Sequence, residues 1–354
     1  MYQDKLLNLY LNFVSFRNFI EFIHNNIPNA MVDIQQLTVP VKDEMVELRR
    51  QYDHFLQHPR PLLKEVLNCV MQHKGKMVRP LLTILSAKLF GPVNDNTYHS
   101  ALTVEFSHTA SLIHDDVVDD SDMRRGYPSI KAQFGNKIAV LVGDYILGES
   151  LKQAASCQNT RVYDIISVTA QVLGEGELLQ MDNISYEEIS EEIYYEILRM
   201  KTCSLFSACT SLGAISTTNN EEDIQNMYDF GQLIGYCFQI RDDIFDYTKS
   251  EILGKPAGND LREGKLTLPI IYALNKAQDP EMFKMAYKMK EGTLSEDEIQ
   301  MMVKFTYDQG GIDYARKTMF EFAEQAKQKL YRYPESDVRQ ALISFMDFVV
   351  GRDR

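Results

Sequence analysis

Apolar residues recur along most of this chain with the spacing of α-helices. From Val41 onward they repeat about every 3.6 residues, and the repeat is best developed over residues 81–89, 165–173 and 230–240. Residues 138–142 could form a short buried strand, but the helical repeat continues through their flanks and favours a helix. The sequence shows no convincing two-residue alternation and no Asn-Gly hairpin signal. We therefore expect an all-α protein.

Helix-breaking residues divide this pattern into separate helices. Glycine and proline interrupt the apolar repeats, and runs of small polar residues indicate loops. Such breaks occur at Gly91-Pro92, 126–128, 217–220, Asp279-Pro280 and Gly310-Gly311. A loop beyond residue 246 is predicted by Gly254, Pro256, Gly258 and Gly264. Because no repeat, low-complexity tract or long linker interrupts the chain, we expect a single large domain over residues 36–354.

Residues 1–35 form an N-terminal extension to which the pattern assigns no definite structure. The segment 6–23 is rich in leucine and phenylalanine, but asparagine, arginine and glutamate interrupt it. It lacks the basic start and the cleavage site of a secretion signal, and it has no run of about 18 apolar residues, as a membrane span requires. Two readings stay open: an amphipathic helix that touches a membrane, or an upstream extension with Met31 opening the globular domain.

Composition narrows the classes of function. Of the 354 residues, 45% are hydrophobic and 25% are charged, which is the balance of a globular protein with a large core. The net charge of −13 argues against nucleic-acid binding, because that activity needs a basic surface. The five cysteines form no CxxC pair and lie in apolar helical patterns, so we expect reduced thiols and a cytoplasmic location.

Two aspartate-rich clusters with the pattern DDxxD carry the most informative chemistry. On a helix, positions i and i+4 share a face, so Asp115 and Asp119 point the same way, as do Asp242 and Asp246. Like charges at this spacing repel and destabilise a helix unless a cation lies between them. Carboxylate oxygens are ligands for Mg²⁺, which also binds phosphate oxygens. The two clusters together predict a magnesium-dependent site for diphosphates.

Basic residues lie beside the first cluster and upstream of it. Arg124 and Arg125 follow the acidic residues directly, and their fork-shaped guanidinium groups suit diphosphate oxygens. Lys76 and Arg79 follow Gly75 at the expected start of a helix, where a second diphosphate could bind. Each group also has a plainer reading: a solvated acidic helix end with salt bridges for the cluster, and ordinary surface charge for the basic loop.

The chain resembles the trans-isoprenyl diphosphate synthases of the polyprenyl synthetase family over about residues 40–350, and among them the long-chain octaprenyl and solanesyl type. The matching motifs are GKMVRP, HTASLIHDDVVDDSDMRRG, the Lys-Thr pair at 201–202, GYCFQIRDDIFDY and GKPAGNDLREGK. The resemblance implies a single helical bundle around a deep central cavity, with the aspartate motifs facing each other across its mouth. It also implies two or three Mg²⁺ ions, isopentenyl diphosphate and an allylic prenyl diphosphate as substrates, and a homodimer. A peripheral membrane contact for product release stays open.

The resemblance assigns roles residue by residue. Asp115 and Asp119 would bind Mg²⁺ on one side of the allylic diphosphate, and Asp242 would bind it from the other side with Asp246 in support. The residues that would hold isopentenyl diphosphate are Lys76, Arg79, His108 and Arg125. Arg124 would contact the allylic diphosphate, and the lysines that would close over both diphosphates are Lys255 and Lys265. The residues that would line the reacting centre are Lys201, Thr202 and Gln239.

The expected reaction follows from these charges. Metals and cations neutralise the allylic diphosphate, its C–O bond ionises, and the double bond of isopentenyl diphosphate attacks the allylic cation. The departed diphosphate then takes up a proton. A dry apolar cavity keeps water away from the cation.

A few positions admit a second reading or depart from the family's pattern. The first basic motif usually reads Gly-Gly-Lys-Arg, whereas residues 74–77 read Lys-Gly-Lys-Met, which puts the flexibility of that loop in doubt. His108 could be a core histidine, but its place on the helix face of Asp115 favours a ligand role. The positions interpreted as structural or as core packing are His114, Tyr194, Tyr195, Met200 and Met227.

The residues before Asp115 bear on product length. Turn by turn, the small side chains on this helix are Ala110 and Ser111, then Ser107, then Val104 and Thr103. Short-chain members of the family tend to place aromatic residues four or five positions before the first aspartate. Each open turn adds about 5 Å of depth, so we expect a long product of about six or more isoprene units. A short-chain farnesyl or geranylgeranyl diphosphate synthase is the alternative.

Other classes of protein fit the sequence less well. Terpene cyclases usually carry an Asn/Ser/Glu pattern in place of the second aspartate motif, and squalene-type synthases fit the basic motifs poorly. A non-catalytic subunit of a heteromeric synthase commonly loses an aspartate motif, and this chain keeps both. A calcium-binding EF-hand requires a loop glycine and a ligand spacing that neither cluster has.

Overall fold

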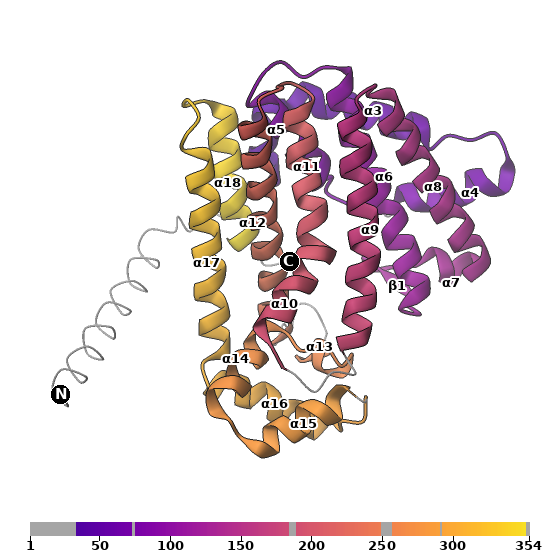
Figure 1. Cartoon of the computed structure of the whole chain (residues 1–354). Coiled ribbons are helices and arrows are strands. Elements are labelled where there is room, and N and C mark those ends of the chain that lie inside the picture. Colours follow the sequence, from indigo (N-terminus) through magenta and orange to yellow (C-terminus); the bar gives the residue numbers. More distant parts are fainter. Residues whose placement is uncertain (1–32, 73–74, 184–188, 249–256, 291, 352–354) are drawn as a thin grey trace.

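The computed structural model describes residues 33–72, 75–183, 189–248, 257–290 and 292–351 of the chain. Most of these residues are helical, and the helices pack into one bundle around a continuous apolar core (Figure 1). The expectation of an all-α fold is therefore confirmed, apart from one very short hairpin.

The centre of the bundle is α11 (Ser204–Ile215), in which every residue after Ser204 is buried. A helix without an exposed face needs neighbours on all sides, and α11 packs most extensively against four other α-helices. These are α5 (Val78–Lys88), α6 (Asp95–Val118), α9 (Thr160–Asn183) and α12 (Glu221–Asp246). The two aspartate clusters lie at the C-terminal ends of α6 and α12, so the packing around α11 sets where the clusters stand.

Further helices cover this centre on both flanks. On one side α8 (Asn136–Ser156) packs along α6, and α7 (Ile130–Phe134) contacts both. On the other side α17 (Gly311–Leu330) packs against α12 and α18 (Asp337–Gly351), the pair drawn in yellow tones in Figure 1. The described N-terminal elements are α2 (Ile34–Thr38), η1 (Val39–Val41), α3 (Lys42–Phe55) and α4 (Pro61–Gln72).

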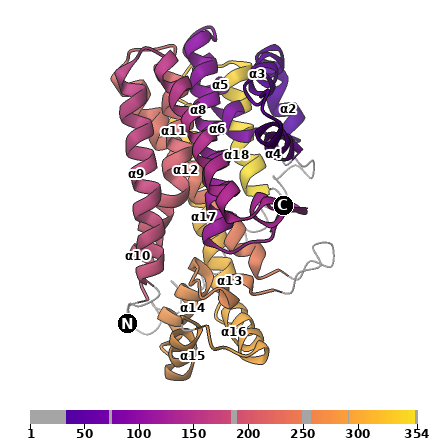
Figure 2. The same cartoon turned by 90° about the vertical axis from the view of Figure 1, so that its right-hand side faces the viewer.

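A group of short helices lies at one end of the bundle, at the bottom of Figures 1 and 2. It consists of α13 (Asn259–Arg262), α14 (Leu268–Ala277), α15 (Pro280–Lys290) and α16 (Glu296–Asp308). Helix α14 contacts α10 (Glu191–Leu198), α12 and α17. The second aspartate cluster therefore lies where the bundle meets this terminal group.

A two-stranded hairpin follows the first aspartate cluster, which the sequence pattern did not predict. Strands β1 (Met123–Arg124) and β2 (Tyr127–Pro128) pair in antiparallel fashion. Arg125 and Gly126 form the loop, with φ angles of 53° and 82°. Positive φ at both loop positions is typical of a type I′ turn, which Asn-Gly most often forms. Two-residue strands are too short to show alternation and the turn is Arg-Gly, so the sequence pattern gave no sign of this hairpin.

Most predicted helix boundaries are confirmed. Residues 138–142 lie inside α8, and the breaks predicted at 217–220, 279–280 and 310–311 all lie at helix ends. Gly258 and Gly264 lie in loops with φ angles of 87° and 76°, whereas Gly254 and Pro256 lie outside the described residues.

Several expectations concern the chain as a whole. The five cysteines form no disulfide, and four of them are buried, as expected. Within the described ranges, no helix has both the length and the apolar character needed to cross a membrane. Residues 6–23 and Met31 lie outside the described residues, so their interpretations stay predictions. The domain boundary expected after residue 35 falls inside α2.

Candidate active site

Three of the five carboxylates in the first aspartate cluster are paired within the chain. Arg124 donates from Nε and Nη2 to Oδ1 of the buried Asp116, at 2.8 and 2.6 Å. Lys131 Nζ lies 2.6 Å from Asp120 Oδ1 and 3.2 Å from Asp122 Oδ1. These salt bridges hold β1 and α7 against the end of α6. Arg124, expected at the allylic diphosphate, is bound to Asp116 in this structure.

The other two carboxylates, Asp115 and Asp119, carry charge that the cluster itself does not neutralise. Burial raises the pKa of Asp115 to about 6, together with the nearby carboxylates of Glu177 and Asp119, while Lys201 and Arg124 oppose the rise. The raised pKa of Asp115 reflects burial first and the repulsion from neighbouring carboxylates second, and the local cations do not offset the two together. A divalent cation among these oxygens would relieve that repulsion, so the residues fit the metal that the sequence predicted.

The last aspartate of the second cluster caps α13. Asp246 accepts hydrogen bonds from the backbone N–H groups of Asn259 and Asp260, at 2.8 and 3.0 Å. This contact brings the side chain of Asp260 to the site, where burial and the charges of Asp243 and Asp246 raise its pKa. Asp246, expected as a supporting carboxylate, thus positions a further carboxylate that the sequence pattern did not identify.

The middle aspartate of this cluster joins two of the predicted catalytic residues. Asp243 is buried, and its Oδ1 accepts from Gln239 Nε2 at 3.0 Å. Gln239 Oε1 in turn accepts from Thr202 Oγ1 at 3.0 Å. Burial raises the pKa of Asp243, although hydrogen bonds from Tyr194 and Gln239 oppose the rise. The structure therefore links Gln239 directly to Asp243.

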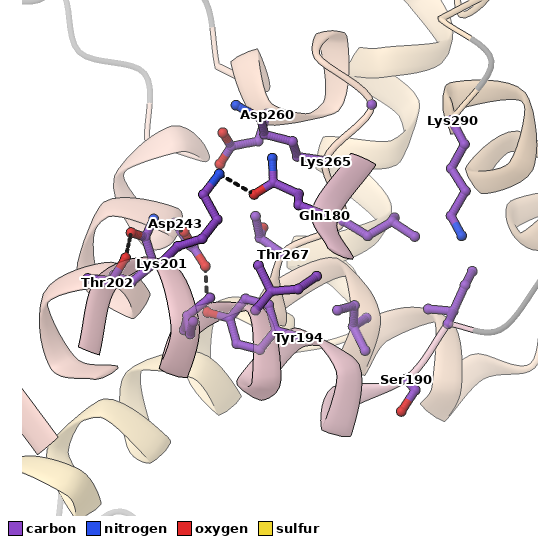
Figure 3. A pocket seen from close by; sticks show the side chains of 17 residues that line it. Gln180, Ser190, Tyr194, Lys201, Thr202, Asp243, Asp260, Lys265, Thr267 and Lys290 are labelled. Atoms are coloured by element: carbon purple, nitrogen blue, oxygen red, sulfur yellow. Dashed lines mark hydrogen bonds between the residues drawn. The ribbon is translucent and has the colours of Figure 1, made fainter. Parts of the chain in front are cut away.

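A cavity of about 200 Å³ opens beside these residues. Its walls come from α9, α10, the turn before α11, α12, α15 and the segment 260–271. Figure 3 shows its labelled lining residues, which are Gln180, Ser190, Tyr194, Lys201, Thr202, Asp243, Asp260, Lys265, Thr267 and Lys290. The apolar part of the lining consists of Ile189, Ile197, Leu198, Leu266 and Ile271. The cavity thus combines carboxylates, ammonium groups and an apolar wall.

Lys265 connects this cavity with the first cluster. Burial lowers its pKa, but Glu263, Asp260 and Asp119 outweigh burial and raise it. Asp119 follows α6 directly, and Asp260 is held by the end of α12, so acidic groups from both sides act on one ammonium group. The predicted partner Lys255 lies outside the described residues.

Lys201 enters the cavity from a π-helical turn, η2 (Arg199–Cys203), between α10 and α11. Its Nζ lies 2.5 Å from Glu177 Oε2 and donates to Gln180 Oε1 at 2.8 Å. Gly176 permits this approach of α9, because a Cβ there would lie 3.0 Å from Lys201 Cγ. Single π-helical turns inside helices frequently occur at functional sites. The predicted residue Lys201 is thus positioned by two polar residues of α9.

A second, smaller cavity of about 50 Å³ is lined by three of the predicted substrate-binding residues, His108, Arg124 and Arg125. Arg79 Nη1 donates to His108 Nε2 at 2.9 Å, and its guanidinium lies 5.1 Å from the Phe206 ring centre. Burial, and then the charges of Arg79 and Arg125, lower the pKa of His108 well below its usual value. His108 is therefore neutral, and its Nε2 accepts the hydrogen bond from Arg79.

Arg125 reaches this cavity from the hairpin and lies against the first basic motif. A Cβ on Gly75 would lie 2.8 Å from Arg125 Nη1, so glycine makes room for the guanidinium. Met77, which stands where the family usually has arginine, is buried and has a left-handed φ of 51° directly before α5. Lys76 is exposed beside it. Residues 73–74 lie outside the described part, so the flexibility of this loop stays a prediction.

The residues predicted to set chain length lie in different surroundings. Ser107 Oγ is 2.7 Å from Ser150 Oγ, so Ser107 belongs to the contact between α6 and α8. Ala110 is buried, and Ser111 Oγ donates to the carbonyl oxygen of His108 at 3.0 Å. Neither cavity described above is lined by these three residues. An open path past Ala110 and Ser111 therefore stays a prediction.

The structure adds site residues that sequence reasoning missed. Glu177 and Gln180, which bind Lys201, stand at positions i and i+3 of α9, a spacing that could have been noticed. Tyr194 belongs to the buried core, as expected, but it also lines the cavity and donates to the second cluster. Lys290 at the end of α15 also lines the cavity, and no local pattern marks it.

The carboxylates suit cations that share their coordination shell with a substrate. Among the described residues, no three acidic, histidine or cysteine side chains converge into a complete metal site. Mg²⁺ typically takes one or two carboxylates and completes its octahedral shell with water and phosphate oxygens. Separate carboxylates around a cavity that also holds lysines fit this mode of binding.

Comparisons with known proteins identify the family. The polyprenyl synthetase family model matches residues 60–305. The chain belongs to the polyprenyl synthetase family. It is therefore a polyprenyl diphosphate synthase, a prenyltransferase of isoprenoid biosynthesis, and its all-helical fold is that of the isoprenoid synthases. The family uses divalent metal ions.

Individual relatives support this assignment over most of the chain. The octaprenyl diphosphate synthase of Haemophilus influenzae is 34% identical over 322 residues, which cover 91% of this chain and 97% of the relative. A polyprenyl synthase of Caulobacter crescentus, crystallised with calcium and isoprenyl diphosphate, is 30% identical with a TM-score of 0.84, covering 92% of this chain and 100% of that one. A geranylgeranyl pyrophosphate synthase of Bacteroides thetaiotaomicron is 41% identical with a TM-score of 0.79, covering 90% and 99%.

Proposed function

We propose that this polyprenyl synthetase condenses isopentenyl diphosphate head to tail, in trans configuration, with an allylic diphosphate and makes a long-chain polyprenyl diphosphate. The observation that carries the proposal is the position of Lys265, which lines the larger cavity with Asp243 and Asp260 and whose pKa is raised in part by Asp119 of the first cluster. Two acidic walls around one cavity are what a diphosphate held by divalent cations requires. The similarity to the octaprenyl diphosphate synthase of Haemophilus influenzae supports a long product.

The larger cavity would take the allylic diphosphate. Asp115 and Asp119 from one side and Asp242 from the other would hold two or three Mg²⁺ ions against it. When bound, Mg²⁺ neutralises the diphosphate and makes it a better leaving group. Lys201 and Lys265 would bind the phosphate oxygens that remain, because both ammonium groups line this cavity.

Thr202 and Gln239 would act at the reacting carbon. The hydroxyl hydrogen of Thr202 is donated to Gln239, and the amide hydrogens of Gln239 point to Asp243. The remaining lone pairs of Thr202 Oγ1 are thus available to the cavity, where they would stabilise an allylic cation. The neighbouring Ile197 and Leu198 would limit the access of water to that cation.

The smaller cavity would take isopentenyl diphosphate. Arg125 and His108 line it, Arg79 donates to His108, and Lys76 lies exposed on the adjoining loop. His108 accepts from Arg79 through Nε2, so its Nδ1–H can donate to a phosphate oxygen. Arg124 also lines this cavity, and through Asp116 it would stand at the border between the two substrates.

We also propose a homodimer, formed through an apolar face of α8 and α9. Large apolar side chains are exposed along both helices, namely Val140, Leu141, Leu151, Tyr163, Val168, Leu178 and Met181. The helices have 21 and 24 residues, so each is about 30–36 Å long. With a strip about 10 Å wide on each, the face approaches the roughly 800 Å² per partner of a stable interface.

Light scattering on a sizing column tests the dimer. The double variant Leu141→Lys/Leu178→Lys should elute as a monomer, because two charges would be buried on each copy. Met301 is an exposed apolar residue on the distant α16, so Met301→Lys is the matched control and should stay dimeric. A monomeric wild-type protein, or a dimer that persists in the double variant, would contradict the proposed face.

Product length is the finer part of the proposal. Ala110, Ser111 and Ser107 are small, and Ala110→Phe should shorten the product if chains pass this turn of α6. The second candidate is a short-chain synthase, which the 41% identity to the Bacteroides thetaiotaomicron geranylgeranyl pyrophosphate synthase favours. An unchanged product distribution for Ala110→Phe would show that the chain takes another path.

A cytoplasmic location and a peripheral membrane contact complete the proposal. The absence of disulfides among the five cysteines supports a reducing compartment. A long prenyl chain is strongly apolar, so release of the product into a membrane is favourable. Cell fractionation tests both points: we expect the protein in the cytosol, with a part that salt washes off the membranes, and a salt-resistant membrane fraction would contradict this.

The decisive experiment for the reaction is incubation with Mg²⁺, labelled isopentenyl diphosphate and farnesyl or geranylgeranyl diphosphate. We expect the label to enter prenyl chains, and chromatography of the dephosphorylated products gives their length. Products that stop at geranylgeranyl diphosphate support the short-chain candidate. If the protein releases diphosphate without adding labelled units, or neither releases diphosphate nor adds labelled units, the proposal is refuted.

A further inference from the structure

We propose that Tyr194 is a positioning residue for the second aspartate cluster and acts through Asp243. The Tyr194 hydroxyl donates to Asp243 Oδ2 at 2.6 Å, and both side chains are buried at the wall of the larger cavity (Figure 3). The inference rests on the proposed function, since it concerns the same site. It identifies the Tyr194 hydroxyl as the group that fixes the orientation of the Asp243 carboxylate.

Asp243 stands in the middle of a chain of hydrogen bonds that joins three elements. Tyr194 of α10 donates to one carboxylate oxygen, and Gln239 of α12 donates to the other. Thr202 of the π-helical turn donates to the amide oxygen of Gln239. With one donor on each oxygen, the carboxylate cannot rotate without breaking a hydrogen bond. Tyr194 therefore sets the orientation of Gln239 and Thr202 as well.

The surroundings explain why this donor is a tyrosine. Asp242, Asp246 and Asp260 are acidic neighbours of Asp243, and a buried carboxylate is costly unless its oxygens are hydrogen-bonded. A lysine or arginine donor would compete with the metal ions for the negative charge. The phenol satisfies the carboxylate without adding a positive charge. Without it, we expect the carboxylate to turn away from Gln239.

The adjacent Tyr195 provides a matched control. Its ring packs edge-on against Tyr236 and Phe322, with ring centres 5.8 and 6.0 Å apart. Unlike Tyr194, it is not part of the cavity lining. Tyr194→Phe and Tyr195→Phe remove the same hydroxyl group from neighbouring positions of α10. A difference between the variants therefore reports the hydrogen bond to Asp243.

Calorimetric binding of inorganic diphosphate in the presence of Mg²⁺ tests the inference without turnover. We expect Tyr194→Phe to bind about tenfold more weakly than wild type, a difference of about 1.4 kcal/mol. Tyr195→Phe should bind within about twofold of wild type, since a hydroxyl away from the cavity contributes little there. Thermal unfolding of both variants confirms that each is folded. In an Asp243→Ala background, Tyr194→Phe should have no further effect, because its action runs through Asp243.

The outcomes separate this inference from the proposed function. If Tyr194→Phe binds inorganic diphosphate with wild-type affinity, or if both tyrosine variants lose affinity equally, the inference is overturned. The proposed function still stands in that case, provided that the wild-type enzyme binds diphosphate and elongates prenyl chains. An undiminished effect of Tyr194→Phe in the Asp243→Ala background overturns the inference too, since the ring would then act by packing alone. A wild-type protein that neither binds inorganic diphosphate with Mg²⁺ nor elongates prenyl chains overturns both.

Discussion

Gly176→Ala should impair the enzyme by displacing the π-helical turn that carries Lys201. A Cβ at Gly176 would lie 2.6 Å from Met200 Cβ and 3.3 Å from the backbone nitrogen of Lys201. Ordinary van der Waals contact begins at 3.4 Å, so α9 and the turn must separate by 3.4 minus 2.6, or 0.8 Å. The closest blocking atom is Met200 Cβ, and Lys201 Cγ and the Lys201 backbone nitrogen lie next to it, so none of the blocking atoms is the flexible end of a side chain. Lys201 then shifts relative to Glu177.

Two effects of opposite sign determine the stability of this variant. Alanine in place of glycine favours a helix by about 1 kcal/mol, whereas forcing a methyl group into a packed contact costs about 1–3 kcal/mol. We expect the free energy of unfolding to fall by about 0–2 kcal/mol. The rate should suffer more, because misplacing a positioned group by nearly 1 Å can cost on the order of 100-fold. We therefore expect kcat to fall about 10- to 100-fold.

Gly174→Ala is the matched control on the same helix. A Cβ at Gly174 meets no atom within 4 Å, so this variant should gain about 1 kcal/mol and keep its rate. Denaturant unfolding and elongation under saturating substrates measure both variants, and light scattering confirms that their oligomeric states match. If Gly176→Ala gains stability as Gly174→Ala does and elongates at the wild-type rate, the close packing of α9 does not position Lys201.

Three further predictions concern the smaller cavity and the first aspartate cluster. Gly75→Ala should displace the Arg125 guanidinium, because the added Cβ would lie 2.8 Å from its Nη1. We expect KM to rise for isopentenyl diphosphate but not for the allylic substrate, and equal changes in both constants would contradict this. Asp116→Ala should leave Arg124 without its partner and cost about 2 kcal/mol in denaturant unfolding, and an unchanged midpoint would count against it. Asp115 has a pKa raised from 3.8 to about 6, so the metal-free folded state keeps a proton that the unfolded state has lost, and stability falls as pH rises from 4 to 6. Metal-free Asp115→Asn should thus be more stable than wild type at pH 7, by on the order of 1 kcal/mol. This difference in stability should shrink below pH 4, where wild type is protonated in both states, and a wild type that is more stable than the variant at pH 7 would refute the prediction.

The sequence predicted the features that depend on neighbours along the chain. Helical periodicity located the helix over residues 138–142, and the i, i+4 spacing of Asp115 and Asp119 placed both carboxylates in one electrostatic environment. The Thr202–Gln239 pair could be inferred from the family resemblance, and a hydrogen bond joins them.

Features that depend on contacts between distant segments could not be predicted in this way. Nothing local distinguishes Asp242 from Asp243, yet the latter is held by Tyr194, which lies 49 positions earlier in the chain. The left-handed conformation of Arg125 allows a hairpin whose two-residue strands are too short to leave a pattern in the sequence. The small size of Ser107 suggested an open path for the product beside it, but its hydroxyl is hydrogen-bonded to Ser150 of α8. In each case tertiary packing decides between alternatives that the sequence pattern leaves equal.

The central claim is that the two aspartate clusters grip one metal-bound diphosphate. A crystal structure with Mn²⁺ and inorganic diphosphate tests it directly, because anomalous scattering locates the ions. The account predicts ions within about 2.3 Å of carboxylate oxygens on both sides, from Asp115 or Asp119 on one and from Asp242 on the other, with the diphosphate between them. Ions confined to one cluster, or bound on surfaces away from the cavity, would contradict the account.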